Sequence, residues 1–140
     1  MKDLDAMRQL VFQRITRPLD LRQYQPEMAV EIQVWVNPPR AMVNEVYGLL
    51  AKASAFEERA RNAEAEELAR LGPAIETAGQ ELAAWFATIW SEGAEETRWS
   101  EAEVQKLIAH SVENDPQLWP WLVLKSVEMI QVYRSGEKKR

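Results

Sequence analysis

The side chains that could perform catalysis or bind a metal are few in this chain of 140 residues. Histidine is the base that most often activates a nucleophile, and His110 is the only histidine present. The chain has no cysteine, which excludes disulfides, thiolate nucleophiles and thiolate zinc sites. A single histidine also excludes metal sites that need two. We therefore predict no catalytic, cofactor-binding or metal-binding residues, and a protein that is not an enzyme.

Carboxylates are the remaining candidates for acid–base chemistry, since 22 residues are Asp or Glu. The densest groups are Glu95-Glu96 and the glutamates at positions 64, 66 and 67. Both are typical of charged surfaces that face water, as helix surfaces usually are. The chain has five glycines and neither a Walker loop nor a Gly-x-Gly-x-x-Gly sequence. Nothing in the sequence therefore indicates a phosphate-binding loop.

The distribution of charge argues against nucleic acid and membrane partners. The formal net charge is −5, and residues 72–133 contain 10 acidic and only 3 basic side chains. A nucleic-acid-binding protein needs a basic surface. No apolar run approaches the ~20 residues that span a bilayer, and the first five residues, MKDLD, lack the apolar stretch of a signal peptide. We expect a cytoplasmic protein.

Composition and length are those of one globular domain over residues 1–140, because 46% of the residues are hydrophobic. An extended or β segment is predicted over residues 1–36. Residues 19–22 alternate apolar and charged side chains, and Pro26 suits the turn that follows, so a hairpin is compatible with the pattern. Residues 4–15 fit strand or helix equally well. The clearest period-2 alternation, typical of a strand, involves Val30, Ile32, Val34 and Val36.

A long helix is predicted over residues 37–71. Asn37 is a good N-cap, and proline is favoured at the first helical position that follows. A helix ending at Gly72-Pro73 would be roughly 50 Å long. It must therefore either project into solvent or break near Ala55.

A C-terminal helical bundle is predicted over residues 72–140. Its first helix carries apolar residues at helical spacing up to Trp90 and ends near Gly93. Ser100 and Glu103 form a capping box that starts the next helix. The last helix includes Trp121 to Arg134. The fold class is thus mainly α, with four helices and a short N-terminal β element.

The last helix carries apolar residues on two sides. At ~100° per residue, Leu122, Val127 and Ile130 share one broad face that suits the core. Trp121, Leu124 and Val132 lie on the other side among charged residues, as in surfaces that bind other proteins. The alternative is that two other helices enclose this one. The candidate protein-binding residues are Trp35, Trp119, Trp121, Leu124 and Val132.

Three N-terminal segments carry a resemblance to a known family: RPLDL at 17–21, YQPEM at 24–28 and VWVNPPR at 34–40. Together they resemble the N-terminal signature of tail assembly chaperones from long-tailed, non-contractile bacteriophages and prophages. In that family a Pro-Glu step precedes a short strand, which ends in Trp-x-Asn-Pro-Pro before a helix. The connector rich in Ala, Glu and Arg and the C-terminal tryptophans are also similar.

The resemblance implies a non-catalytic protein, without cofactors, in the host cytoplasm. Such chaperones coat the tape measure protein, keep it soluble, help recruit tail tube subunits and are absent from the finished tail. Many have a longer form made by ribosomal frameshifting, and we expect a homo-oligomer. Two other functions fit the sequence. One is a structural tail or neck subunit retained in the virion, and the other is a small helical regulatory or antitoxin-like binding module.

Overall fold

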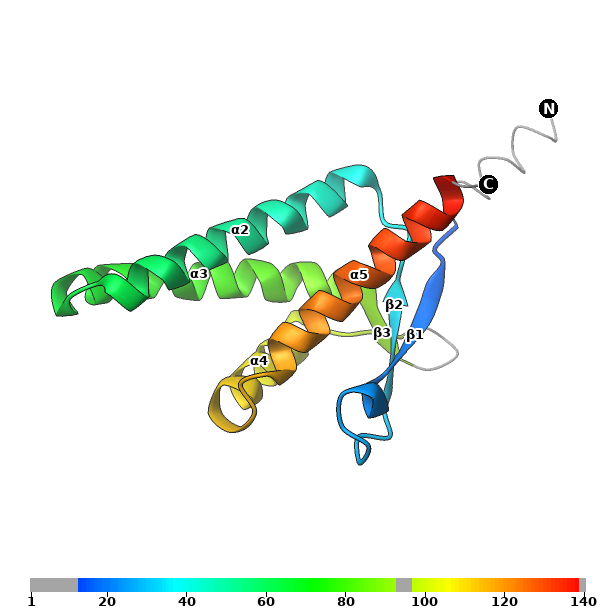
Figure 1. The fold of residues 1–140 in the computed structure, drawn as a ribbon, viewed down its shortest axis with the longest axis horizontal. Coiled ribbons are helices and arrows are strands. Elements are labelled where there is room, and N and C mark those ends of the chain that lie inside the picture. Colours follow the sequence, from blue (N-terminus) through cyan, green and yellow to red (C-terminus); the bar gives the residue numbers. More distant parts are fainter. Residues whose placement is uncertain (1–12, 93–96, 139–140) are drawn as a thin grey trace.

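The fold was analysed in a computed structural model, which describes residues 13–92 and 97–138. The described chain is mainly helical, with four α-helices and a strand pair near the N-terminus, as predicted. The helices form two antiparallel pairs, α2–α3 and α4–α5, which meet beside a small sheet (Figure 1). Within the described residues, no helix is long and apolar enough to cross a membrane.

The predicted hairpin is confirmed. Strand β1 (Thr16–Asp20) pairs antiparallel with β2 (Glu31–Trp35), and Leu19 lies opposite Ile32. Leu19 and Ile32 are both buried, as the alternation requires. A short 3-10 helix, η1 (Leu21–Gln23), follows β1 within the connection. Of the ambiguous stretch 4–15, residues 4–12 lie outside the described residues.

The sheet has two further strands that were not predicted. Strand β3 (Trp90–Glu92) pairs with β2, and β4 (Thr97–Arg98) pairs with β3. Trp90 was expected at the end of a helix near Gly93, which is wrong. The reason is that β2 would leave unpaired backbone groups on its second edge, and the residues after Ile89 pair with that edge.

The start of the first long helix also differs from the expectation. Helix α2 (Arg40–Asn62) has Pro39 at its N-cap position, without a side-chain hydrogen bond. Asn37 instead accepts a hydrogen bond from the Ile15 N–H (2.7 Å) and donates one to the Gln13 carbonyl (2.7 Å). Asn37 does not cap α2, because its amide extends the β1–β2 ladder beyond the strands.

The predicted helix 37–71 is two helices. Helix α2 ends at Asn62 and α3 (Ala65–Ile89) runs back along it, so the break lies neither near Ala55 nor at Gly72-Pro73. Pro73 lies inside α3 on an exposed side, where water can satisfy the carbonyl left without its usual N–H partner. The far end of this α2–α3 hairpin projects away from the sheet (Figure 1).

Two more helices complete the described chain. Helix α4 (Glu101–Asn114) begins at the predicted capping box, in which Glu103 N–H donates to Ser100 Oγ and Ser100 N–H donates to Glu103 Oε1, both at 3.1 Å. Helix α5 (Leu118–Lys138) contains the predicted last helix and begins three residues earlier than Trp121. Pro120 therefore falls in its first turn, where proline is tolerated.

The core lies where the sheet, α3 and α5 meet. Phe86, Trp90 and Trp119 form its aromatic centre, with ring centroids 5.0 to 5.9 Å apart. Trp90 is fully buried, and its indole N–H donates to the hydroxyl of Ser126 on α5 at 3.0 Å. Because a buried indole N–H needs an acceptor, this bond fixes α5 against β3.

Candidate protein-binding surfaces

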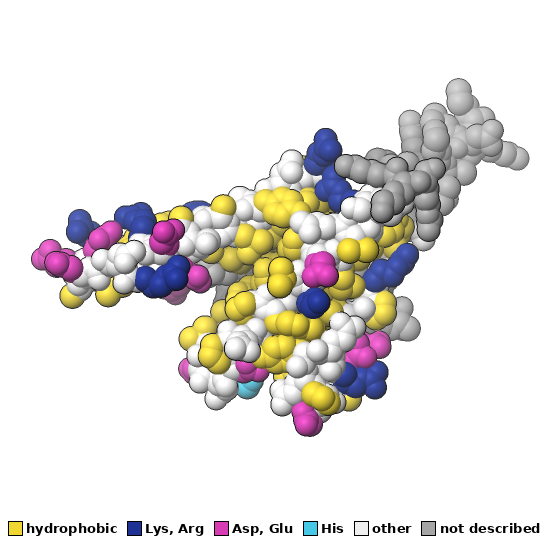
Figure 2. Space-filling model, in the orientation of Figure 1, with side chains coloured by type: hydrophobic (Ala, Val, Ile, Leu, Met, Phe, Trp, Pro, Cys, Tyr) yellow, Lys and Arg dark blue, Asp and Glu magenta, His cyan; other side chains and the backbone are white. Residues whose placement is uncertain are grey.

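Helix α5 exposes apolar side chains as its sequence predicts. Leu124 is 62% exposed and Val132 is 64% exposed, whereas Leu122 and Ile130 on the opposite side are buried. Hydrophobic side chains accordingly gather over the middle of the molecule, where α5 crosses the view (Figure 2). Trp121 belongs to the same side, but it is half-buried and its ring packs on Tyr24 at a centroid distance of 5.2 Å. It therefore also holds the β1–β2 connection.

Val132 also borders a groove between α5 and β1, with a volume of about 420 Å³. The apolar lining includes Pro18 and Met129. The charged lining residues are Arg17, Lys125 and Glu128. Because Lys125 lies 3.8 Å from Glu128, this groove has mixed charge.

The other two predicted residues lie elsewhere. Trp35 is half-buried on β2, with the Arg14 guanidinium 4.7 Å above its ring. Trp119 is half-buried in the aromatic centre of the core and lines a second, larger groove. The five predicted residues therefore do not form one surface. Trp121, Leu124 and Val132 follow one side of α5, and Trp119 and Trp35 are separate from them.

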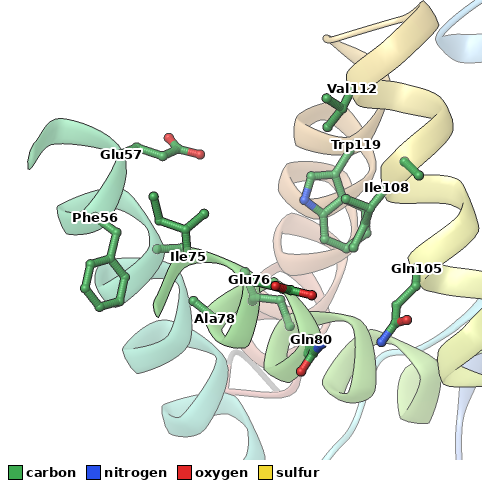
Figure 3. Close-up of a pocket in the computed structure, with 14 residues that line it drawn as sticks. Phe56, Glu57, Ile75, Glu76, Ala78, Gln80, Gln105, Ile108, Val112 and Trp119 are labelled. Atoms are coloured by element: carbon green, nitrogen blue, oxygen red, sulfur yellow. The ribbon is translucent and has the colours of Figure 1, made fainter. Parts of the chain in front are cut away.

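The larger groove lies between the α2–α3 hairpin and the α4–α5 pair and has a volume of about 540 Å³ (Figure 3). We call it the interhelical groove. One wall carries Phe56 and Ile75, and the other carries Val112 (72% exposed) with Ile108. Trp119 from α5 also lines it. Every helix of the described chain thus contributes to one apolar depression.

The charged side chains that line the interhelical groove are acidic. Among the described residues that line it, only Glu57 and Glu76 are charged, and no ion pair to either is formed within the described chain. The polar residues Gln80 and Gln105 complete the rim. The interhelical groove thus has an apolar floor and an acidic rim.

Sequence reasoning missed Phe56 and Val112 as binding candidates. The signal for Val112 was present, because it follows Val104 and Ile108 at spacings of four residues, which places all three near one face of a helix. Val104 is buried, Ile108 is half-buried and Val112 is exposed. The rising exposure along this face shows that α4 packs in the core at Val104 and borders the groove at Val112.

The residues first considered for catalysis lie apart from both grooves. His110 is exposed on α4, and its ring Nδ1 lies 3.3 Å from the Asn114 side-chain amide. Glu67 pairs with Arg59 at 3.5 Å, and Glu95-Glu96 lies outside the described residues. Within the described residues no cluster of three metal-ligating side chains occurs.

One hydrogen bond joins the hairpin connection to the turn between α4 and α5. The Tyr24 hydroxyl donates to the Asp115 carboxylate at 2.6 Å. This bond raises the pKa of Tyr24 above its usual range, because ionisation would break it beside a negative charge. The contact fixes the position of the loop against which Trp121 packs.

Comparison of the chain with protein-family models, curated proteins and solved structures finds no match.

Proposed function

We propose that the chain is a non-enzymatic tail assembly chaperone of long-tailed, non-contractile bacteriophages. In this role it binds the tape measure protein, keeps it soluble and helps recruit tail tube subunits. The identity of the client rests on the resemblance, whose motifs cover about residues 17–50. The observation that supports helix binding is the interhelical groove, which is apolar and open to solvent at Val112.

A long helical client needs such a surface. An amphipathic helix outside a folded assembly exposes an apolar stripe, and a helix laid in an apolar groove buries that stripe at positions i, i+3, i+4 and i+7. The interhelical groove has helices on both sides, with Ile75 on one wall and Val112 on the other. Covering side chains as exposed as Val112 supplies favourable free energy of association.

The exposed side of α5 offers a second contact. Leu124 and Val132 do not line the interhelical groove, so they remain available when the groove is occupied. We assign this side to self-association or to tube subunits, consistent with the expected homo-oligomer. Two separate apolar surfaces suit a protein that holds one partner while it recruits another.

The deciding experiment is co-expression with the tape measure protein encoded in the source genome. The client is expected to be soluble and to co-purify only when the chain is present. Val112→Asp with Ile75→Asp should abolish this effect. The control variant Val30→Asp with Leu68→Asp introduces the same two charges at exposed apolar residues outside both grooves and should leave client solubility intact. A client that is soluble alone, or insoluble in both cases, contradicts the proposal.

Mass spectrometry of purified virions separates the chaperone from a retained tail or neck subunit. A chaperone is expected to be missing from the particle, and its presence at stoichiometric level would favour the virion subunit. A tight complex with a small neighbouring gene product, in place of the tape measure protein, would favour the regulatory or antitoxin-like module.

A further inference from the structure

We propose that the interhelical groove selects a basic amphipathic helix, whose apolar stripe is flanked by lysine or arginine. This inference rests on the proposed function for the site and adds the chemistry of the bound segment. It follows from where the described charges lie around the groove, from the size of the residues on its floor, and from the exposure of its walls.

The α2–α3 wall of the groove contributes two carboxylates, and α4 carries a third just beyond the lining. Glu57 of α2 and Glu76 of α3 line it directly and are exposed. On α4, Glu101 lies one turn before Gln105, a lining residue, and accepts a hydrogen bond from its side-chain amide at 3.2 Å. By helical spacing Glu101 shares the face of α4 that carries Gln105 and Val112. A helix in the groove would therefore have two carboxylates along its α2–α3 flank, with Glu101 beyond Gln105 on the side of α4.

The cations of the same helices lie outside the groove. Lys52 pairs with Glu81 at 3.3 Å, and Arg59 pairs with Glu67 at 3.5 Å, so both cations connect α2 to α3. Neither is among the residues that line the groove, and Lys106 of α4 is not among them either. The described lining thus contains carboxylates and no lysine, arginine or histidine. This asymmetry sets the sign of the partner's charge.

The floor of the groove is shaped for the apolar side of a helix. The small residues on it come from α2, α3 and α4: Ala53, Ala78, Gly79 and Ala109. They leave space between Phe56 and Ile75 on one side and Val112 and Trp119 on the other (Figure 3). Large apolar side chains of a partner can therefore enter the floor, while its flanking side chains reach the carboxylates at the rim.

A second copy of this chain fits the groove less well. The chain has a net charge of −5, and residues 72–133 are strongly acidic, so two facing grooves would repel each other. A partner helix with lysine or arginine beside its stripe converts the same carboxylates into rim ion pairs. Such pairs chiefly accelerate association and are weakened by salt.

The test uses the full chain and two designed peptides of about 20 residues, long enough to form several helical turns. Both carry the same Leu/Ala stripe, flanked by lysine in one peptide and by glutamate in the other. Fluorescence anisotropy measures Kd in low and high salt. The lysine peptide should bind about tenfold more tightly at low salt, as expected for two or three exposed ion pairs, and the preference should shrink as salt rises.

Matched variants locate the effect. Glu57→Lys with Glu76→Lys should reverse the preference between the peptides. Glu58→Lys with Glu66→Lys changes the net charge equally on the same two helices, at exposed positions outside the groove, and should leave the preference in place. Val112→Asn should weaken binding of both peptides about tenfold, since it removes an apolar contact from the wall without changing the charge of the groove.

Several results would overturn the inference. These are equal affinity for both peptides, an equal effect of the control variant, or unchanged binding by Val112→Asn. Self-association of the free chain that Val112→Asn abolishes would assign the groove to a second copy instead. The outcome is separable from the proposed function, because a chain that binds the lysine peptide but fails to solubilise the tape measure protein supports only the groove chemistry. Solubilisation without a charge preference supports only the chaperone.

Discussion

Replacement of Asn37 by aspartate separates two roles that this residue could have. Asparagine and aspartate are equally good N-caps, so a capping residue would tolerate the change. In the structure Asn37 bridges two strand ends, and its amide N–H₂ donates to the Gln13 carbonyl at 2.7 Å. A carboxylate cannot donate this bond and places an oxygen against the carbonyl. We therefore expect Asn37→Asp to be destabilising.

The magnitude follows from the two bonds. Aspartate keeps the acceptor for the Ile15 N–H, so one donor bond is lost, worth about 1 kcal/mol. The facing oxygens add a further cost, which the solvent exposure of this bond keeps small, and the sum is about 1–2 kcal/mol. Asn37→Ala removes both bonds and leaves the Ile15 N–H unpaired, which costs about 2 kcal/mol or more.

Urea denaturation at neutral pH measures the free energy of unfolding of the three proteins. If Asn37→Asp is as stable as wild type at neutral pH, the bridging role is refuted and Asn37 acts as an N-cap.

Two further substitutions test the helices and the loop contact. Pro73→Ala should raise the free energy of unfolding, measured in urea, by about 1–3 kcal/mol, because alanine restores a hydrogen bond inside α3. A neutral or destabilising effect would indicate that a helix starts at Pro73. Tyr24→Phe should destabilise below the ordinary tyrosine pKa of about 10, since it removes the bond to Asp115. Because the pKa of Tyr24 is raised in the folded state, that bond is lost as pH rises through the raised value. The difference in stability between wild type and Tyr24→Phe should therefore vanish in strong alkali.

Structural features that depend on interactions between residues close in sequence were predictable from the sequence. The capping box at Ser100 and Glu103 needs only residues three positions apart, and both of its hydrogen bonds form. The β1–β2 hairpin follows from alternation that buries Leu19 and Ile32. In each case the partner groups lie close in sequence, or the period itself defines the buried face.

Structural features that depend on hydrogen-bond partners far away in sequence were predicted wrongly. Trp90 continues the helical spacing of α3, yet it pairs in the sheet with Val34, far away in sequence. Asn37 is a residue type favoured at helix N-caps. Its actual hydrogen-bond partners, Gln13 and Ile15, come within reach only when β1 and β2 pair. Tertiary contacts therefore override local preference at both junctions between strand and helix.

The same distinction explains why the candidate site was only partly predictable. A helical wheel shows that Leu124 and Val132 lie opposite the core face of α5, and both are exposed. It does not reveal that Phe56 and Val112 line the same groove, because that requires the return of α3 along α2 and the packing of α4 on α3. A groove built by four helices is a property of their arrangement.

The acidic character of its rim likewise becomes visible only in the structure, where Lys52 and Arg59 form ion pairs between α2 and α3. The peptide experiment therefore tests the arrangement of the helices as directly as it tests the partner's charge.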